Sequence, residues 1–460
     1  MAVKLVVQIV LARLLAPEEF GMLALMLVFV NIGNVIVQSG LNTALVQDPD
    51  VEDDDYSTVF WMSFVVSLIL YGVIFFSAPY IASFYAMPAL VDPLRVLGLI
   101  LLINAYNAVQ IGKLTRDLEM KKIFLGTIAA SVVSSVLGIG TAVAGMGVWA
   151  LAIQQLSYQF TNVVANAFQV DWHPRLVFHA NRAKKLFSFG WKLLVSGLLN
   201  SVSQSLSSLI IGKQFSGYQL GLVSQGEKYP AALGSMLDGV IQPVMLSTIA
   251  KVQSDISYAR RIMRRALKTS TYLVFPVMGL FAVVAPTLVP LLLGDQWTES
   301  VPFFQLFCIA YGLLPVHTTN LQTLVGMGRS DLFLRLEMVK VVVNVACILI
   351  AAFVFNDVYF LVGAYIIAAV ISMFINAFPN KRVVGYSFGA QIRDIGPAFL
   401  LTLAACGVAQ LTALFSLTGL ALLIVQIFIF FVVYFGLSLF FKLEEFSYLV
   451  SEVGKKMFSR

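Results

Sequence analysis

The sequence predicts an all-α integral membrane protein with about fourteen transmembrane helices. Two observations predict this class. Hydrophobic residues make up 59% of the 460 residues and charged residues only 12%, about half the charged fraction of a typical soluble domain. Apolar stretches of spanning length also recur along the whole chain, and helices satisfy their backbone hydrogen bonds inside a bilayer. The alternation expected of a membrane barrel is absent.

Lys251–Lys268 is too polar to span, and its apolar residues share one side of a helix, so a basic amphipathic helix on the membrane surface is expected there. Met1–Leu15 is short for a span, and we expect the first helix to be truncated. The expected spans are 1–15, 21–45, 58–78, 93–112, 123–144, 148–169, 186–211, 221–247, 269–293, 302–325, 339–355, 359–378, 395–412 and 418–440.

Most of the 30 lysine and arginine residues fall in alternate connections and in the C-terminal tail. By the positive-inside rule that face is cytoplasmic, so both termini are expected inside. The connection Asp48–Asp55 carries six acidic residues and no basic one, and these acids are expected to begin the next helix.

Two short repeats predict parallel halves. Leu11–Gly21 resembles Ile211–Gly221 at an offset of 200 residues, and Leu118–Lys122 resembles Leu336–Lys340. Internal repeats are a common way to build a transporter, with the substrate site where the halves meet.

Several spans carry polar residues at helical spacing, which places each set on one helix face. Interhelical hydrogen bonding is the simplest role for such amides, and a water-lined cavity is the alternative. Basic residues within spans are functional candidates, although snorkelling to the interface is an alternative. The stripes include Asn31, Asn34 and Gln38, then Asn104, Asn107 and Gln110, then Gln159, Asn162 and Asn166, then Lys192, Ser196, Asn200 and Gln204.

No nucleotide-binding loop, metal-ligand cluster or catalytic constellation stands out in the sequence, so we expect no cofactor, no metal and no enzymatic activity. The three cysteines lie in apolar segments and do not predict disulfides. No nucleic-acid partner is expected.

Seven short segments carry recognisable motifs: Leu11–Gly21, Ala44–Gln47, Tyr56–Trp61, Gly147–Leu151, Phe187–Leu193, Gln225–Pro230 and Gly328–Glu337. These motifs resemble those of bacterial polysaccharide transporters, in the superfamily that also holds multidrug antiporters and the lipid II flippase. The resemblance covers about residues 11–340 and favours exporters of O-antigen or teichuronic acid repeat units.

This resemblance implies two pseudo-symmetric six-helix bundles around a central cavity, plus two accessory helices. The implied bundles are 1–170 and 186–378, the second including segment 251–268, with a basic cytoplasmic linker at 171–185. The accessory helices are expected in 395–440, and a cytoplasmic tail in 441–460.

The resemblance also implies a flippase of the bacterial plasma membrane that moves a polyprenyl-pyrophosphate oligosaccharide, beside polymerases and glycosyltransferases as partners. Cations would bind the pyrophosphate and amides the sugar. The candidate substrate-binding residues are Lys192, Arg95, Lys228, Asn31, Asn34, Gln38, Asn200 and Gln204, and the candidates for ion coupling are Glu227 and Asp238.

Three alternatives stay open at this point. The chain could be an ion-coupled antiporter of drugs or small molecules, although no buried carboxylate is seen in the first six spans. It could also be a membrane component of a polysaccharide polymerase complex, either catalytic or as a scaffold.

Overall fold

The computed structural model describes residues 2–38, 41, 45, 51–415 and 417–447, with the side chains at positions 2–4, 189 and 192 left out of the description. Helices dominate, and no strand occurs in these ranges. The residues form two compact units, Met1–Ser224 and Gln225–Arg460. Within the described ranges, twelve helical segments are long and apolar enough to cross a membrane, so the chain is a multi-pass integral membrane protein.

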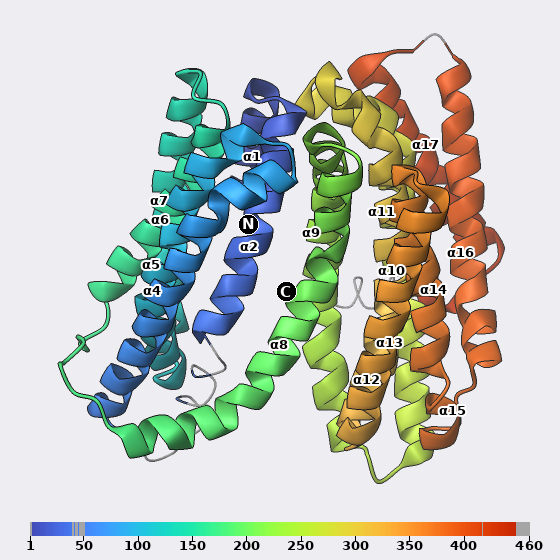
Figure 1. Cartoon of the computed structure of the whole chain (residues 1–460). Coiled ribbons are helices and arrows are strands. Elements are labelled where there is room, and N and C mark those ends of the chain that lie inside the picture. The colour runs from blue at the N-terminus through green and yellow to red at the C-terminus, as the bar shows by residue number, and fades with distance from the viewer. Residues whose placement is uncertain (1, 39–40, 42–44, 46–50, 416, 448–460) are drawn as a thin grey trace. The chain divides into compact units, whose positions relative to one another are not determined.

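Unit 1 holds the first helices (Figure 1). α6 packs against α7, α4 against α5, and α2 against α8. The helices are α1 (Ala2–Leu14), α2 (Pro17–Gln38), α4 (Asp53–Phe84), α5 (Val91–Arg116), α6 (Met120–Val143), α7 (Val148–Ala167), α8 (Ala180–Gln214) and the first turns of α9 (Gly217–Lys251).

Unit 2 takes the rest of α9 and all later helices. α10 contacts α11, α12, α16 and α17 and is therefore the central helix of its core. The helices are α10 (Ile256–Leu293), α11 (Val301–Gly312), α12 (Leu314–Gly326), α13 (Ser330–Ile350), α14 (Val358–Ala377), α15 (Asn380–Val383), α16 (Phe388–Leu411) and α17 (Gly419–Phe440).

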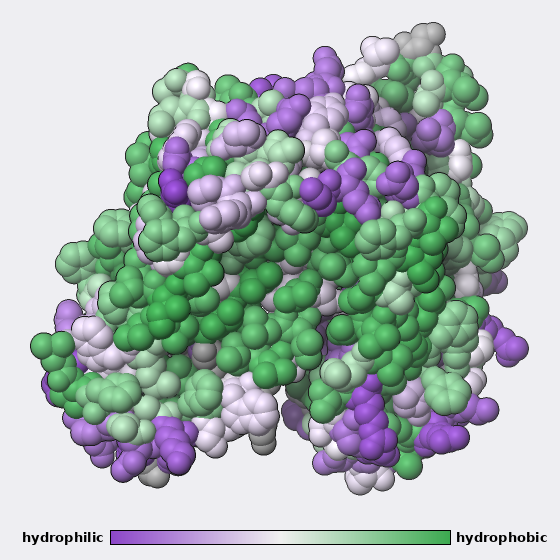
Figure 2. All heavy atoms as spheres, in the orientation of Figure 1, coloured by the Kyte–Doolittle hydropathy of each residue, from purple (hydrophilic) through white to green (hydrophobic). Residues whose placement is uncertain are grey.

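As far as the described residues go, the fourteen expected spans fall on helical segments, and the predicted all-α membrane fold is confirmed. The two that are not among the twelve apolar segments are 1–15, where α1 is short, and 148–169. In each unit, hydrophobic side chains cover the middle of the helices and hydrophilic ones gather at the helix ends (Figure 2).

The acidic residues before the second long helix begin that helix as expected. The backbone N–H of Glu52 donates to Asp55 at 3.0 Å, and the two residues form a capping box at the start of α4. Asp53 also pairs with Lys113 at 3.1 Å, and Asp55 with Arg182 at 3.4 Å. The carboxylates therefore satisfy the helix N-terminus and tie it to neighbouring basic residues. The acids at positions 48 and 50 lie outside the described residues.

The structure differs from the expected surface helix at 251–268. α9 continues to Lys251, and α10 begins at Ile256 and runs without a break into the apolar span. Ala259, Met263 and Leu267 are fully buried in the core of unit 2. The amphipathic pattern therefore reflects packing against protein, and this stretch is the polar end of a long spanning helix.

Helix α8 also begins earlier than its expected span. Its first residue, Ala180, lies inside the predicted linker 171–185, so part of that linker is helical. Figure 1 shows α8 bending after this basic beginning.

Glycine and proline residues often interrupt helices. Gly226 and Pro230 nevertheless do not end α9, and Pro276 and Pro286 do not end α10. The division between the two compact units at Ser224 falls after the predicted linker, and the two predicted bundles stay a prediction.

The repeat at an offset of 200 residues has a counterpart in space, within unit 1. A Cβ atom added at Gly21 would lie 1.8 Å from the carbonyl oxygen of Gly217. One added at Gly221 would lie 1.9 Å from the carbonyl oxygen of Pro17. Since Gly217 and Gly221 are the equivalents of Pro17 and Gly21, the contact is reciprocal, as expected for repeats related by a two-fold axis.

An ion pair fixes the polar end of α10 in unit 2. The guanidinium of Arg264 donates to both carboxylate oxygens of Asp394 on α16, each at 2.7 Å, and the Tyr386 hydroxyl donates to the same carboxylate at 2.6 Å. Asp394 is only 8% exposed. We expect Asp394→Asn to lower the free energy of unfolding by about 1–3 kcal/mol, because it removes a charged, bidentate acceptor.

The matched control is Asp331→Asn. Asp331 pairs with Arg329 at 3.1 Å, but both side chains are about half exposed, so we expect a loss below about 1 kcal/mol. Thermal unfolding of the purified proteins in one detergent compares the two variants. Equal losses would contradict the role given to Asp394.

Candidate functional site

The candidate residues on α2 and α8 lie on helices that pack against each other in unit 1. A Cβ atom at Gly197 of α8 would lie 3.1 Å from Val35 of α2. The chain enters α8 from the end at which α2 stops, so we take the two helices as antiparallel. Counting at 1.5 Å per residue from this contact places Asn31 level with Asn200 and nearby residues. The polar stripes of α2 and α8 therefore lie at a similar height along the two packed helices.

Most of these amides are exposed, although they belong to spanning helices. Asn31, Gln38, Asn200 and Gln204 are exposed, and Asn34 is half-buried. Asn34 accepts a hydrogen bond from Asn104 at 3.0 Å, and Gln204 donates to Asn200 at 3.1 Å. Lipid cannot satisfy the remaining donors and acceptors. These side chains therefore require water, protein or a polar ligand.

The stripes on α5 and α7 behave differently. Asn166 donates to Asn107 at 3.1 Å and to Asn162 at 2.8 Å, and all three are buried. Gln110 is fully buried as well. These amides join helices, as the interhelical role predicts. The exposed amides of α2 and α8 are thus the ones left for a ligand.

The three basic candidates have different surroundings. Arg95 donates to the carbonyl oxygen of Phe75 at 3.3 Å and pairs with Asp92 at 3.4 Å, and its guanidinium lies 4.5 Å from the Phe75 ring centroid. Its partners thus come from α4 and from its own helix. Lys228 is half-buried in α9 of unit 2. Lys192 belongs to α8, and its side chain lies outside the described residues.

Two carboxylates on α9 are each held by a hydroxyl group in unit 2. Glu227 accepts a hydrogen bond from Tyr311 of α11 at 2.9 Å. Asp238 accepts one from Thr318 of α12. Both acids are candidates from the sequence, but their partners are not, because a hydroxyl on a distant helix leaves no local pattern.

A buried polar network joins several helices of unit 2. Asn320 of α12 exchanges hydrogen bonds with Gln391 of α16 at 2.9 and 3.0 Å and accepts one from Asn380 at 2.9 Å. Asn376 contacts the Nδ1 atom of His317 at 3.2 Å. The four amides of this network are fully buried, so the network joins α12, α14, α15 and α16.

No group of three or more potential metal ligands occurs in the part of the chain that the structure describes.

The chain is similar to known proteins of polysaccharide biosynthesis. Residues 10–302 match a family described as "Polysaccharide biosynthesis protein". The succinoglycan biosynthesis transport protein ExoT of Rhizobium meliloti (strain 1021) is 23% identical over 84% of this chain and 76% of its own length. The teichuronic acid biosynthesis protein TuaB of Bacillus subtilis (strain 168) is 24% identical over 83% of this chain and 80% of its own length.

Solved structures share the fold. The lipid II flippase MurJ in an inward closed conformation superposes with a TM-score of 0.74 at 14% identity, covering 96% of both chains. An inward-facing multidrug resistance transporter of the MATE family gives 0.65 at 17% identity, covering 83% of this chain and 94% of that one.

Proposed function

We propose that this chain, which belongs to the family of polysaccharide biosynthesis proteins, moves a lipid-linked oligosaccharide across a membrane. The observation that carries the proposal is the set of exposed amides on the spanning helices α2 and α8. A sugar that leaves water needs donors and acceptors to replace its hydration, and amides supply both. The names of ExoT and TuaB, each a polysaccharide transport or biosynthesis protein, support a saccharide cargo.

In this proposal Asn31, Asn34, Gln38, Asn200 and Gln204 bind sugar hydroxyls. Lys192, Lys228 and Arg95 attract the pyrophosphate of a polyprenyl carrier, because cations are worth more at low dielectric than at a surface. The bundles 1–170 and 186–378 rock to expose the site to either side, with the helices of 395–440 as accessories. Glu227 and Asp238 are the groups proposed to couple an ion.

The proposed location is the bacterial plasma membrane. Because most basic residues lie in alternate connections, we place those connections and both termini in the cytoplasm. Polymerases and glycosyltransferases are the proposed partners, since they would produce and consume such a substrate. The chain itself would be a transporter without catalytic residues.

The test is leaflet transfer of a fluorescent undecaprenyl-pyrophosphate oligosaccharide in proteoliposomes. We expect Asn200→Leu/Gln204→Leu to slow transfer at least about tenfold, since two lost hydrogen bonds of about 1 kcal/mol each reduce binding to that extent. The control is Gln410→Leu, an exposed amide of α16 outside the proposed path, which should transfer at the wild-type rate. Wild-type transfer by the double variant would remove these two residues from the site.

An ion-coupled antiporter is the second candidate, favoured by the half-buried carboxylates of Glu227 and Asp238 on α9. The same proteoliposomes decide between the two. Drug efflux driven by a proton or sodium gradient, without transfer of the sugar lipid, would support the antiporter.

A further inference from the structure

The first turns of α8 in unit 1 present three faces. Ala183 and Leu186 are buried, so their face is covered by protein. At about 100° per residue, Phe187 and Trp191 lie beside that face, yet their side chains are 44% and 46% exposed. The rest of the circumference is polar, and its exposed residues are Asn181, Lys184, Lys185 and Ser188. Two large aromatic residues are therefore exposed between a covered face and a polar one.

These aromatic residues lie where α8 enters the membrane. The part of α8 that is long and apolar enough to span begins at Leu193, just after Trp191. Figure 1 shows the first turns of α8 running across the bottom of the view and the later turns rising steeply from them. Tryptophan is enriched at the membrane boundary, because its ring is apolar and its N–H group is polar. Phe187 and Trp191 thus lie at the level where headgroups meet hydrocarbon.

Contacts with α4 fix the orientation of this part of α8. Arg182 pairs with Asp55 at 3.4 Å, and the backbone N–H of His179 donates to the Thr58 hydroxyl at 3.2 Å. Leu186 belongs to a buried cluster that includes residues of α4. Because α4 holds one face of the helix, the aromatic face beside it stays exposed.

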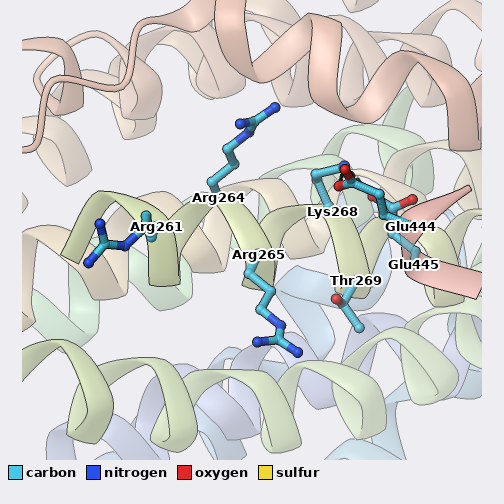
Figure 3. Close-up of a pocket in the computed structure, with 7 residues that line it drawn as sticks. All are labelled: Arg261, Arg264, Arg265, Lys268, Thr269, Glu444 and Glu445. Atoms are coloured by element: carbon cyan, nitrogen blue, oxygen red, sulfur yellow. Dashed lines mark hydrogen bonds and ion pairs between the residues drawn. The ribbon is translucent and has the colours of Figure 1, made fainter. Parts of the chain in front are cut away.

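The basic stretch at the start of α10 in unit 2, where the sequence predicted a surface helix, has different surroundings. Two of its cations bind acids: Arg264 pairs with Asp394, as described above, and Lys268 binds Glu444 at 3.0 Å and Glu445 at 2.6 Å (Figure 3). Its apolar face is buried in the core of unit 2. At the start of α8, part of the apolar face remains exposed. The start of α8 therefore has the surface expected of a helix that lies on a membrane.

We propose that the first turns of α8 lie on the membrane surface, with Phe187 and Trp191 immersed beside the lipid headgroups. Lys184 and Lys185 extend from the polar face towards headgroups and water. A helix of this kind binds the bilayer through its apolar area, so the partner is the lipid surface itself. In the orientation proposed above, this is the cytoplasmic surface. The segment predicted as a cytoplasmic linker then ends on the bilayer.

The same anchor sets the depth of the polar stripe of α8. At 1.5 Å per residue, Asn200 follows Trp191 by about 14 Å along the helix, and Gln204 follows it by about 20 Å. Because the hydrocarbon core is about 30 Å thick, both amides come near its middle. Aromatic residues that contact no sugar thus hold the sugar site at its depth, a consequence that rests on the proposed function.

The experiment places nitroxide labels on single cysteines of the full chain in nanodiscs, after the three native cysteines are replaced by alanine. Labels at Phe187→Cys and Trp191→Cys should collide with oxygen, which concentrates in lipid. We expect both to be about tenfold less accessible to a water-soluble nickel chelate than a label at Lys185→Cys, because polar solutes are excluded from hydrocarbon. Thermal unfolding confirms that each labelled protein is folded.

The reference for deep lipid is Val132→Cys, an exposed position in the middle of α6. Its ratio of oxygen to nickel collisions should exceed the ratio at Phe187→Cys. Equal nickel accessibility at positions 185, 187 and 191 would overturn the proposal and place the segment in water. Shielding of positions 187 and 191 from both reagents would also overturn it, in favour of a cover of protein.

A second arm tests the anchoring with a label at Leu199→Cys, an exposed apolar position of α8. Phe187→Gln/Trp191→Gln should lower the ratio of oxygen to nickel collisions at this label, since the helix start then leaves the lipid. Phe187→Leu/Trp191→Leu keeps an apolar surface and should leave the ratio unchanged. Equal ratios in the two double variants would overturn the anchoring role. Because neither arm measures leaflet transfer, their failure is separate from a failure of the proposed transport.

Discussion

Replacing Gly21 by alanine is expected to destabilise the protein by about 1–3 kcal/mol, against the usual direction of this substitution. In a helix interior alanine is normally about 1 kcal/mol better than glycine. Here the new Cβ atom would lie 1.8 Å from the carbonyl oxygen of Gly217, a backbone atom that no side-chain rotation can remove. α2 and the start of α9 would have to separate.

Gly221→Ala should behave alike, since its Cβ atom would lie 1.9 Å from the carbonyl oxygen of Pro17. The controls are Gly72→Ala on α4 and Gly140→Ala on α6, where an added Cβ atom meets nothing within 4 Å. Both controls should match or exceed the wild-type melting temperature. A Gly21→Ala protein as stable as the Gly140→Ala control would show that the two helices do not cross this closely.

Asn320→Leu is expected to cost about 2–4 kcal/mol of stability, because it removes the buried amide that exchanges two hydrogen bonds with Gln391 and accepts one from Asn380. Unfolding in detergent measures this loss. The control is Asn31→Leu, an exposed amide whose replacement should change stability by less than about 0.5 kcal/mol.

A double-mutant cycle adds a second check. Asn320→Leu/Gln391→Leu removes both members of the central pair, so its cost should be smaller than the sum of the single losses. Strictly additive losses would show that the two amides do not interact.

Most of the fold could be predicted from the sequence, because the bilayer permits few structures. Apolar stretches of spanning length had to become helices, and in the described residues the expected spans fall on helical segments, with 302–325 divided between α11 and α12. The pattern at 251–268 misled for a physical reason: an amphipathic helix looks the same whether its apolar face meets lipid or protein. Only the burial of Ala259, Met263 and Leu267 distinguishes these cases.

The sequence predicted which polar residues are candidates for the site, but not which of them are already bonded to other helices. Helical spacing places Asn107, Asn166, Asn200 and Gln204 on polar stripes alike. Helical spacing does not say which stripe faces a partner helix. A hydrogen bond between Asn107 of α5 and Asn166 of α7 distinguishes this pair from Asn200 and Gln204, which are exposed. Residues distant in sequence, such as Asp394 with Arg264 and Tyr311 with Glu227, meet only through helix packing.

The amino-acid sequence alone establishes that this chain crosses a membrane many times as helices, where its repeats lie and which polar residues are candidates. Composition and periodicity are enough for that, because the cost of an unpaired peptide group in lipid selects the helix. Only helix packing settles which amides are already satisfied and which acid pairs with Arg264 of α10. Those properties depend on neighbours from other helices, and no local pattern encodes them.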